Sequence, residues 1–339
     1  MNADVTHMKQ IVSQDTDVLL SLEAASKDLG FDLLDEVIKL GLPPDLLKNP
    51  DVFVPSQLFN CLLEHIANDM HCKHLGLLMA HHLQTPHLGI PTRVMSLCQN
   101  FREALLKANE YSAFYRDTGP WQSSTEGNNV SIFKIHDLID GHHYHQRSLF
   151  GTAQMYRLIL QLNGSEWKPS SVSFSFANPG GRFYETYQNF FDCAVKFDQP
   201  FDGVTFDAKY LDSSIVTADR ELLKDVELHI ETLNSEILTN GDFISHAKQI
   251  ISQRLNFATC TLEEVAEFLS LTPCDLSKRL EQSALSFITL LEEQVCEKAT
   301  FYLTQLNAPV ELILSALMPG NEPRLNDLLT RRLAALNQW

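Results

Sequence analysis

"LSLTPCDLSKRL", residues 269–280, decides the fold of the C-terminal part of the chain. Thr272 is suited to cap a helix, and Pro273 would take the first helical position, where a missing N–H costs nothing. Leu276 and Leu280 are four residues apart and therefore share one helix face. The stretch predicts a short turn followed by a capped helix whose leucine face packs inward.

The preceding "TLEEVAEFL", residues 261–269, predicts a partner helix. Thr261 and Glu264 have the spacing of a capping box, in which each side chain binds the other residue's amide. The apolar stripe of this helix is formed by Leu262, Val265, Ala266 and Leu269. Two capped helices around a turn are typical of a helix-turn-helix, although an ordinary helical hairpin has the same pattern.

The inward leucines also determine which residues of the second helix point outward. At about 100° per residue, the outer face carries four side chains with two more at its flanks. They are Cys274, Asp275, Lys278 and Gln282, flanked by Ser277 and Arg279. This is the face that would enter a DNA major groove, where Asp275 would repel phosphate but could accept a hydrogen bond from cytosine.

Helical spacing continues to the end of the chain. Residues 286–303 predict one long amphipathic helix, and residues 309–317 and 324–339 predict a further pair separated by "MPGNEP". Three basic residues of this last part are further candidates for DNA contact: Arg324, Arg331 and Arg332. The predicted layout is two helix pairs joined by a long helix.

The first 216 residues predict an α+β domain, because helical spacing over residues 17–118 gives way to alternation after Gly127. Strands are expected within residues 128–139, 172–179 and 201–211, and helices over residues 148–162 and 181–191. We therefore expect a domain over 1–216, a connecting helix and hinge over 217–240, and an all-α domain over 241–339.

These segments resemble the AraC/XylS family of transcription regulators. The C-terminal resemblance rests on "LEEVAEFLSLTPCDLSKRLEQSALSF" and "VELILSAL". The N-terminal half is similar to the AraC-type arabinose-binding domain, on "GLPPDLLKNPDVFVP", "HLGLLMAHHL", "LGIPTRVMSLCQNFREAL", "GSEWKPSSVSFSFANP" and "FDCAVKFDQPFDGVTFDAKYLDSSI". The resemblance implies an N-terminal sensing and dimerising domain and a double helix-turn-helix that binds double-stranded DNA. A homodimer and a small-molecule effector are implied as well.

The chain departs from the family pattern in both helix pairs. Ser270 and Ala284 stand where the family usually has glycine, and Val295 stands where its linker helix usually carries arginine. In the second motif, Met318 and Pro319 replace a Gly-Phe pair, and Leu325 and Asp327 replace the usual aromatic and basic pattern. The second motif is therefore degenerate.

Charge limits how the chain can bind a polyanion. The formal net charge is -17, and residues 241–339 hold eight basic and twelve acidic residues. Phosphate neutralisation dominates DNA affinity, so binding must be local and steeply salt-dependent. A family relative that has lost specific DNA binding and acts through protein contacts is the alternative interpretation.

The sequence carries no secretory signal or membrane-spanning pattern, so a cytoplasmic location without membrane association is expected. Its seven cysteines stand singly and predict free thiols. No nucleophile elbow, P-loop or dinucleotide fingerprint appears, so we expect no enzyme, no catalytic residue and no cofactor.

The sequence offers candidate residues for two kinds of small-molecule site. The histidine clusters are His81, His82 and His87, and His142, His143 and His145. Because such clusters are common in loops and no thiol pair accompanies them, no metal site is predicted, and metal-dependent catalysis is only an outlying alternative. The candidate effector-binding residues are Tyr156, Arg157, Tyr184 and Tyr187.

Overall fold

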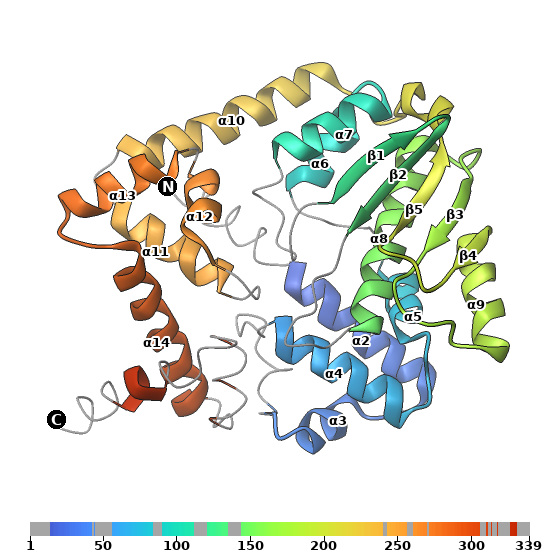
Figure 1. The fold of residues 1–339 in the computed structure, drawn as a ribbon, viewed down its shortest axis with the longest axis horizontal. Coiled ribbons are helices and arrows are strands. Elements are labelled where there is room, and N and C mark those ends of the chain that lie inside the picture. The colour runs from blue at the N-terminus through green and yellow to red at the C-terminus, as the bar shows by residue number, and fades with distance from the viewer. Residues whose placement is uncertain are drawn as a thin grey trace. The chain divides into compact units, whose positions relative to one another are not determined.

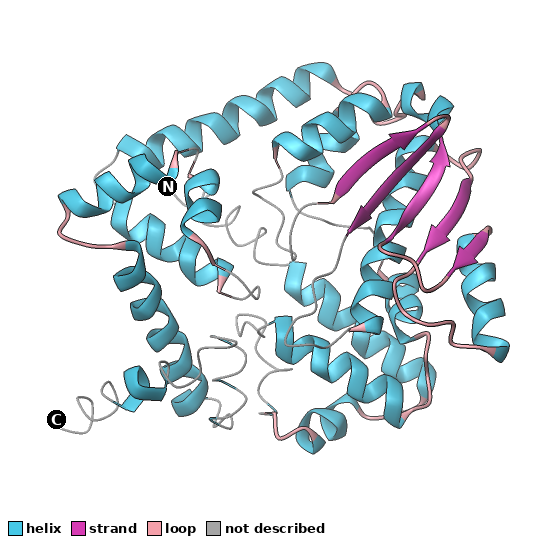
Figure 2. Ribbon diagram, viewed as in Figure 1, coloured by secondary structure: helices cyan, strands magenta, loops and turns pink. Residues whose placement is uncertain are grey.

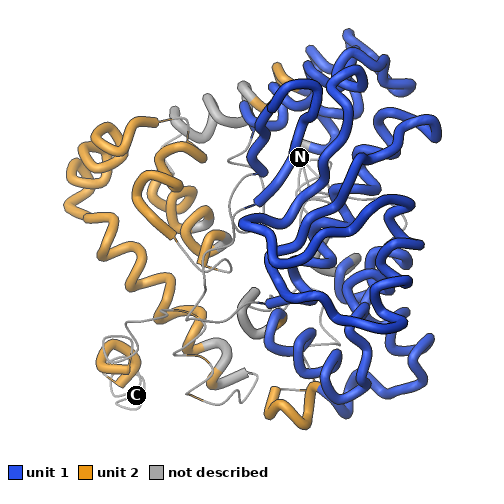
Figure 3. The backbone as a smooth tube through the Cα atoms, turned by 45° about the vertical axis from the view of Figure 1, so that its right-hand side comes forward, with its two compact units in different colours: residues 1–36, 60–226 blue, residues 37–59, 227–339 orange. Residues whose placement is uncertain are grey.

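The computed structural model describes residues 14–42, 44, 56–83, 90–111, 121–134, 144–239, 243–255, 260–269, 271–305, 310, 313, 317 and 326–330. The chain divides into two compact units (Figure 3). The first takes in residues 1–36 and 60–226, and the second takes in residues 37–59 and 227–339.

The first unit is built on a five-stranded mixed sheet with the strand order β1-β2-β5-β3-β4 (Figure 2). The strands are β1 (Gln122–Glu126), β2 (Asn129–Lys134), β3 (Pro169–Ser173), β4 (Ala194–Lys196) and β5 (Asp202–Asp207). Only β3 and β4 pair in parallel. Val204 of β5 lies opposite both Ile132 and Val172, and all three side chains are buried. Side chains alternate between the two faces of a strand, so this register gathers the apolar residues on one face.

The helices up to residue 239 are labelled in chain order in Figure 1. They are α2 (Gln14–Leu29), α3 (Leu33–Lys39), α4 (Ser56–Asp69), α5 (Leu75–His82), α6 (Ile90–Leu97), α7 (Phe101–Glu110), α8 (His145–Asn163), α9 (Gly181–Phe191) and α10 (Arg220–Thr239), with a 3-10 turn over Ala208–Asp212. α8 packs against β5 and α5, and α9 packs against β4. At Gly76 in α5, a Cβ atom would lie 2.6 Å from the carbonyl oxygen of Gln146. Glycine therefore allows the close approach of α5 to the start of α8.

The second unit contains α11 (Phe243–Arg254), α12 (Leu262–Phe268), α13 (Pro273–Gln282) and α14 (Phe287–Gln305). One apolar cluster joins them, with Ile251, Val265, Leu276 and Leu290 all fully shielded from solvent. Of the residues expected in the last helix pair, Ile313, Leu317 and Leu329 are buried in the same cluster, whereas Val310 is exposed. Leu314, Leu325 and Leu333 lie outside the described residues.

The structure confirms the predicted α+β character of the N-terminal part and corrects its strand list. α9 has the predicted bounds, and α8 extends the predicted helix to His145–Asn163. The prediction missed β1 and β4. Every residue of β1 is exposed and β4 has only three residues, so neither contains an apolar alternation that could reveal it. α10 (Arg220–Thr239) lies within the segment 217–240 that was predicted to form the connecting helix and hinge, and residue 240 lies outside the described part of the chain.

Ala284, where the family pattern has glycine, ends α13 in a left-handed conformation with φ 56°. The N–H of Leu285 donates to the carbonyl of Leu280 at 3.0 Å, and the N–H of Ala284 donates to that of Glu281 at 2.9 Å. These are the two bonds of a Schellman motif, which favours glycine at the left-handed position. Gly30 occupies the equivalent position after α2, with φ 75°.

We predict that Ala284→Gly stabilises the protein by about 0.5–1 kcal/mol, because glycine adopts positive φ without the steric cost that alanine bears. The matched reverse change, Gly30→Ala, should destabilise it by about 1 kcal/mol, since a Cβ there would meet nothing within 4 Å and only the backbone cost applies. Urea unfolding followed by circular dichroism measures both. A lower midpoint for Ala284→Gly would contradict the left-handed assignment.

Candidate nucleic-acid interface and ligand pocket

The first turns of α12 and α13 are capped as predicted. The N–H of Glu264 donates to Thr261 Oγ1 at 3.2 Å, and the N–H of Thr261 donates to Glu264 Oε2 at 2.9 Å, which completes the capping box of α12. At α13, the N–H of Asp275 donates to Thr272 Oγ1 at 3.1 Å, and Pro273 is the first helical residue. Such caps are each worth about 1 kcal/mol, so the sequence itself sets where α13 begins.

The inward face of α13 is also as predicted. Leu276 and Leu280 are 0% and 1% exposed, and they belong to the same buried cluster as Val265 and Ala266 of α12. Burying two leucines fixes the rotation of α13 about its own axis, because any other rotation would return apolar surface to water.

The predicted outer face is exposed. Cys274, Asp275, Lys278 and Gln282 are exposed, and Ser277 and Arg279 are half-buried. Exposure makes the first four residues available to a partner, and contact of all six with DNA is a prediction.

Two members of this face have protein partners of their own. The hydroxyl of Thr272 donates to Asp275 Oδ2 at 2.7 Å, so the Asp275 carboxylate reinforces the start of α13. The guanidinium of Arg279 lies over the ring of Phe243, the first residue of α11, at 5.5 Å from the ring centroid. A cation–π contact of this kind holds Arg279 against α11.

Other basic residues of the second unit are paired with carboxylates. Lys248 Nζ lies 2.8 Å from Glu293 Oε1, and Arg254 Nη2 lies 2.9 Å from Glu264 Oε1. Among the described residues, Lys278 forms no ion pair. Lys278 is therefore the exposed positive charge of the outer face of α13. Arg324, Arg331 and Arg332, the remaining predicted DNA contacts, lie outside the described residues.

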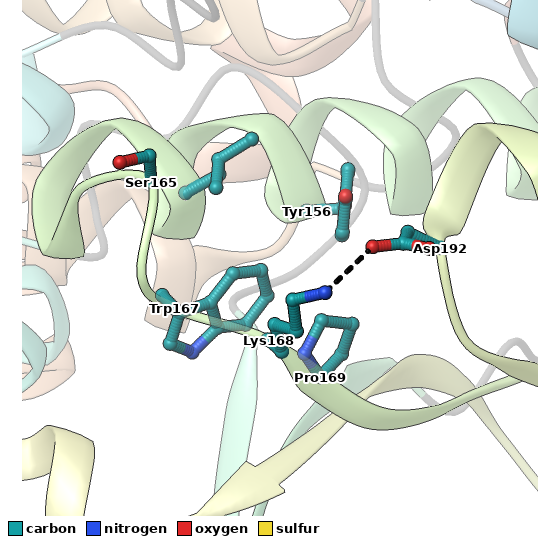
Figure 4. A pocket seen from close by; sticks show the side chains of 7 residues that line it. Tyr156, Ser165, Trp167, Lys168, Pro169 and Asp192 are labelled. Atoms are coloured by element: carbon teal, nitrogen blue, oxygen red, sulfur yellow. Dashed lines mark hydrogen bonds and ion pairs between the residues drawn. The ribbon is translucent and has the colours of Figure 1, made fainter.

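A recess of about 370 Å³ opens on the first unit, where the end of α8 meets the segment leading into β3 (Figure 4). It is lined by Tyr156, Leu160, Ser165, Trp167, Lys168, Pro169 and Asp192. Tyr156 and Trp167 are 8% and 2% exposed, with ring centroids 5.6 Å apart. Lys168 Nζ and Asp192 Oδ2 lie 3.2 Å apart at its edge. Burial raises the pKa of Tyr156, with Cys193 and Asp192 adding to the effect, so its phenol stays neutral.

Of the four predicted effector-binding residues, Tyr156 alone lines this recess. Arg157 donates to the carbonyl oxygens of Ala80 and Leu83 at the end of α5. Tyr187 is 1% exposed, and its hydroxyl donates to the carbonyl oxygen of Lys73 at 2.7 Å. Tyr184 is half-buried, with its ring 6.1 Å from that of Phe197. Backbone carbonyls thus occupy the polar groups of Arg157 and Tyr187.

The sequence prediction missed the other residues of the recess. They come from α8, from the segment after it and from the end of α9, and no common spacing connects them. The one signal was "GSEWKPSS", residues 164–171, which places a tryptophan, a lysine and a proline together in a short connection.

The histidines show other contacts. His145 stacks on Phe176 at 5.0 Å between ring centroids, and His82 Nε2 lies 2.6 Å from Asp28 Oδ2. His87, His142 and His143 are outside the described residues. Within the described ranges, no three His, Cys, Asp or Glu side chains are placed to hold a metal ion.

None of the helices in the described ranges is both long and apolar enough to cross a bilayer.

The free thiols differ in their expected reactivity. Cys274 is exposed on α13, whereas burial raises the pKa of Cys193 to about 11 and that of Cys260 to about 12. The thiolate is the nucleophile, so a raised pKa leaves a thiol protonated and unreactive near neutral pH.

We predict that iodoacetamide at about pH 8 alkylates Cys274 at least about 100-fold faster than Cys260, with Cys193 also slow. Mass spectrometry of peptides cut after glutamate by endoproteinase Glu-C measures the three rates over time, because Glu264 and Glu267 separate Cys260 from Cys274. Cys274→Ser should remove the fast modification and leave the slow ones unchanged. Equal rates for Cys274 and Cys260 would contradict the burial of Cys260.

Comparison with known proteins adds three findings. Residues 30–215 match the family described as "Arabinose-binding domain of AraC transcription regulator, N-term". The HTH-type transcriptional regulator VirS of Mycobacterium tuberculosis is 25% identical over 288 residues, which cover 82% of each chain. The crystal structure of the transcriptional regulator CdpR from Pseudomonas aeruginosa is 16% identical and has a TM-score of 0.45, covering 88% of this chain and 93% of that one.

Proposed function

Because the chain belongs to the family of AraC transcription regulators with the arabinose-binding type of N-terminal domain, we propose that it binds specific duplex DNA through α13. The observation that carries the proposal is the exposed face of α13, which a buried leucine stripe and a complete cap hold in one orientation. A helix held in this way can place its first turns against base edges in a major groove.

The proposed contacts divide by chemistry. Cys274, Ser277, Lys278 and Gln282 would face the bases, with Asp275 accepting from cytosine as far as its bond to Thr272 allows. Arg279, Arg324, Arg331 and Arg332 would neutralise phosphates. Lys278 and these arginines supply about five contacts per protomer, so we propose a homodimer that doubles them.

We propose that residues 1–216 sense an effector and dimerise, that residues 217–240 connect the domains, and that residues 241–339 form the double helix-turn-helix. An effector that binds more tightly to the dimer when its two α13 helices are in one arrangement would shift the population toward that arrangement. Spacing between the recognition helices would then determine which operators are bound.

Lys278→Ala should weaken binding to operator DNA by about 1–3 kcal/mol and reduce the salt slope of log affinity by about 1, because one exposed cation leaves the interface. Lys224→Ala is the matched control, since Lys224 is an exposed lysine on α10 and its loss changes the net charge equally. Fluorescence anisotropy with duplex DNA from upstream of the protein's own coding sequence measures both.

Equal effects of the two substitutions would overturn the assignment of the DNA-facing surface. A folded protein that binds no DNA even at low salt would overturn DNA binding itself. It would favour the alternative of a family relative that acts through protein contacts.

Phe243 should act as a positioning residue for Arg279. We predict that Phe243→Leu lowers DNA affinity about threefold, because the guanidinium loses its aromatic support. A double-mutant cycle separates this role from a general loss of packing. Phe243→Leu should have no further effect in an Arg279→Ala background, whereas additive losses would refute the coupling.

A further inference from the structure

We propose that the recess beside Tyr156 and Trp167 binds a small zwitterion with an apolar side chain, the chemistry of an apolar α-amino acid. The inference rests on the proposed function for its meaning, since a ligand bound here would be the effector.

The apolar wall of the recess is formed before any ligand arrives. The ring of Tyr156 makes an edge contact with Phe191 at 5.3 Å between centroids, and Trp167 makes one with Phe206 at 5.9 Å. Phe191 and Phe206 are fully buried, so the core fixes both wall residues. Because Tyr156 and Trp167 are 8% and 2% exposed, only the rim of this wall is open, and Leu160 and Pro169 complete it; a small hydrocarbon group would lie against this preformed rim.

The edge of the recess carries one charge of each sign. Lys168 and Asp192 are 70% and 73% exposed, and an ion pair this exposed is worth at most about 1 kcal/mol. A ligand can therefore separate the two groups at little cost. Figure 4 shows the two side chains meeting beside Tyr156 and Trp167.

The backbone holds Asp192 in place. It ends α9 in the left-handed conformation with φ 49°, and its N–H donates to the carbonyl of Gln188 at 2.9 Å. Aspartate and asparagine tolerate this conformation better than most residues do. The carboxylate is thus presented from a fixed point, while the long Lys168 side chain can move.

These features select a ligand that carries both charges. A carboxylate can take the place of Asp192 beside Lys168, and an ammonium can take the place of Lys168 beside Asp192. A monoanion would leave Asp192 unpaired and close to a like charge. A monocation would leave Lys168 unpaired and close to a like charge. A volume of about 370 Å³ restricts the ligand to a single small molecule.

The test uses three probes with the same phenyl group and different charges: phenylalanine, 3-phenylpropionate and phenethylamine. Isothermal titration calorimetry on the full-length protein, without DNA, should show phenylalanine binding with a Kd of about 1 mM or tighter. Each singly charged analogue should bind about three- to fivefold more weakly, since it loses one exposed charge pair.

Variants then locate the site. Lys168→Met and Asp192→Asn should each weaken phenylalanine binding about three- to fivefold, and asparagine preserves the left-handed end of α9. Lys27→Met is the matched control, because it removes an equally exposed ion pair, with Glu23, on α2 and should leave binding unchanged.

Three results would overturn the proposal: no binding of phenylalanine at about 10 mM, equal binding of the three probes, or equal effects of all three variants. DNA binding by α13 is measured separately by anisotropy. A failure of the recess therefore leaves the DNA-binding proposal standing, and a failure of DNA binding leaves the calorimetric result intact.

Discussion

Burial of Leu276 and Leu280 against α12 is the constraint on which the proposed DNA-facing surface depends. Each buried leucine contributes about 1.5–3 kcal/mol, far more than a single exposed polar contact. The caps at Thr261 and Thr272 fix where the two helices begin, and the leucines fix how α13 is turned. Burial of these two leucines therefore determines which side chains of α13 face outward.

Electrostatics explains how an acidic chain can retain a local positive site. Lys248 and Arg254 are matched by Glu293 and Glu264, and Arg279 lies against an aromatic ring. Among the described residues of the second unit, these three basic groups are thus engaged in contacts within the protein. Lys278 differs, because it lies on the solvent side of a helix whose opposite side is buried. In a chain of net charge -17, few neighbouring cations reinforce Lys278, so its loss should weaken binding more than the loss of one lysine from a broadly basic surface.

The parts of the structure that the sequence predicts well are those governed by neighbours in the chain. The capping box, the leucine spacing of α13 and the bounds of α9 all follow from residues within four positions of one another. The recess does not, because Tyr156, Trp167 and Asp192 are brought together only when three separate segments pack. Arg157 and Tyr187 illustrate the same limit. Their side chains are polar and suited to a ligand, yet tertiary packing has already paired them with carbonyl groups.

Strand β1 has a consequence for how the molecule behaves in a crowded solution. It ends the strand order, so one side of its backbone has no partner strand within the described sheet. An open strand edge is a template on which another chain can add, and apolar edges start aggregation. Here the edge reads "QSSTE" and is exposed throughout, so an incoming strand would find no apolar surface to bury. The polar composition of β1 leaves no apolar alternation from which the sequence could predict the strand. The same composition protects this sheet edge against the addition of strands from other chains.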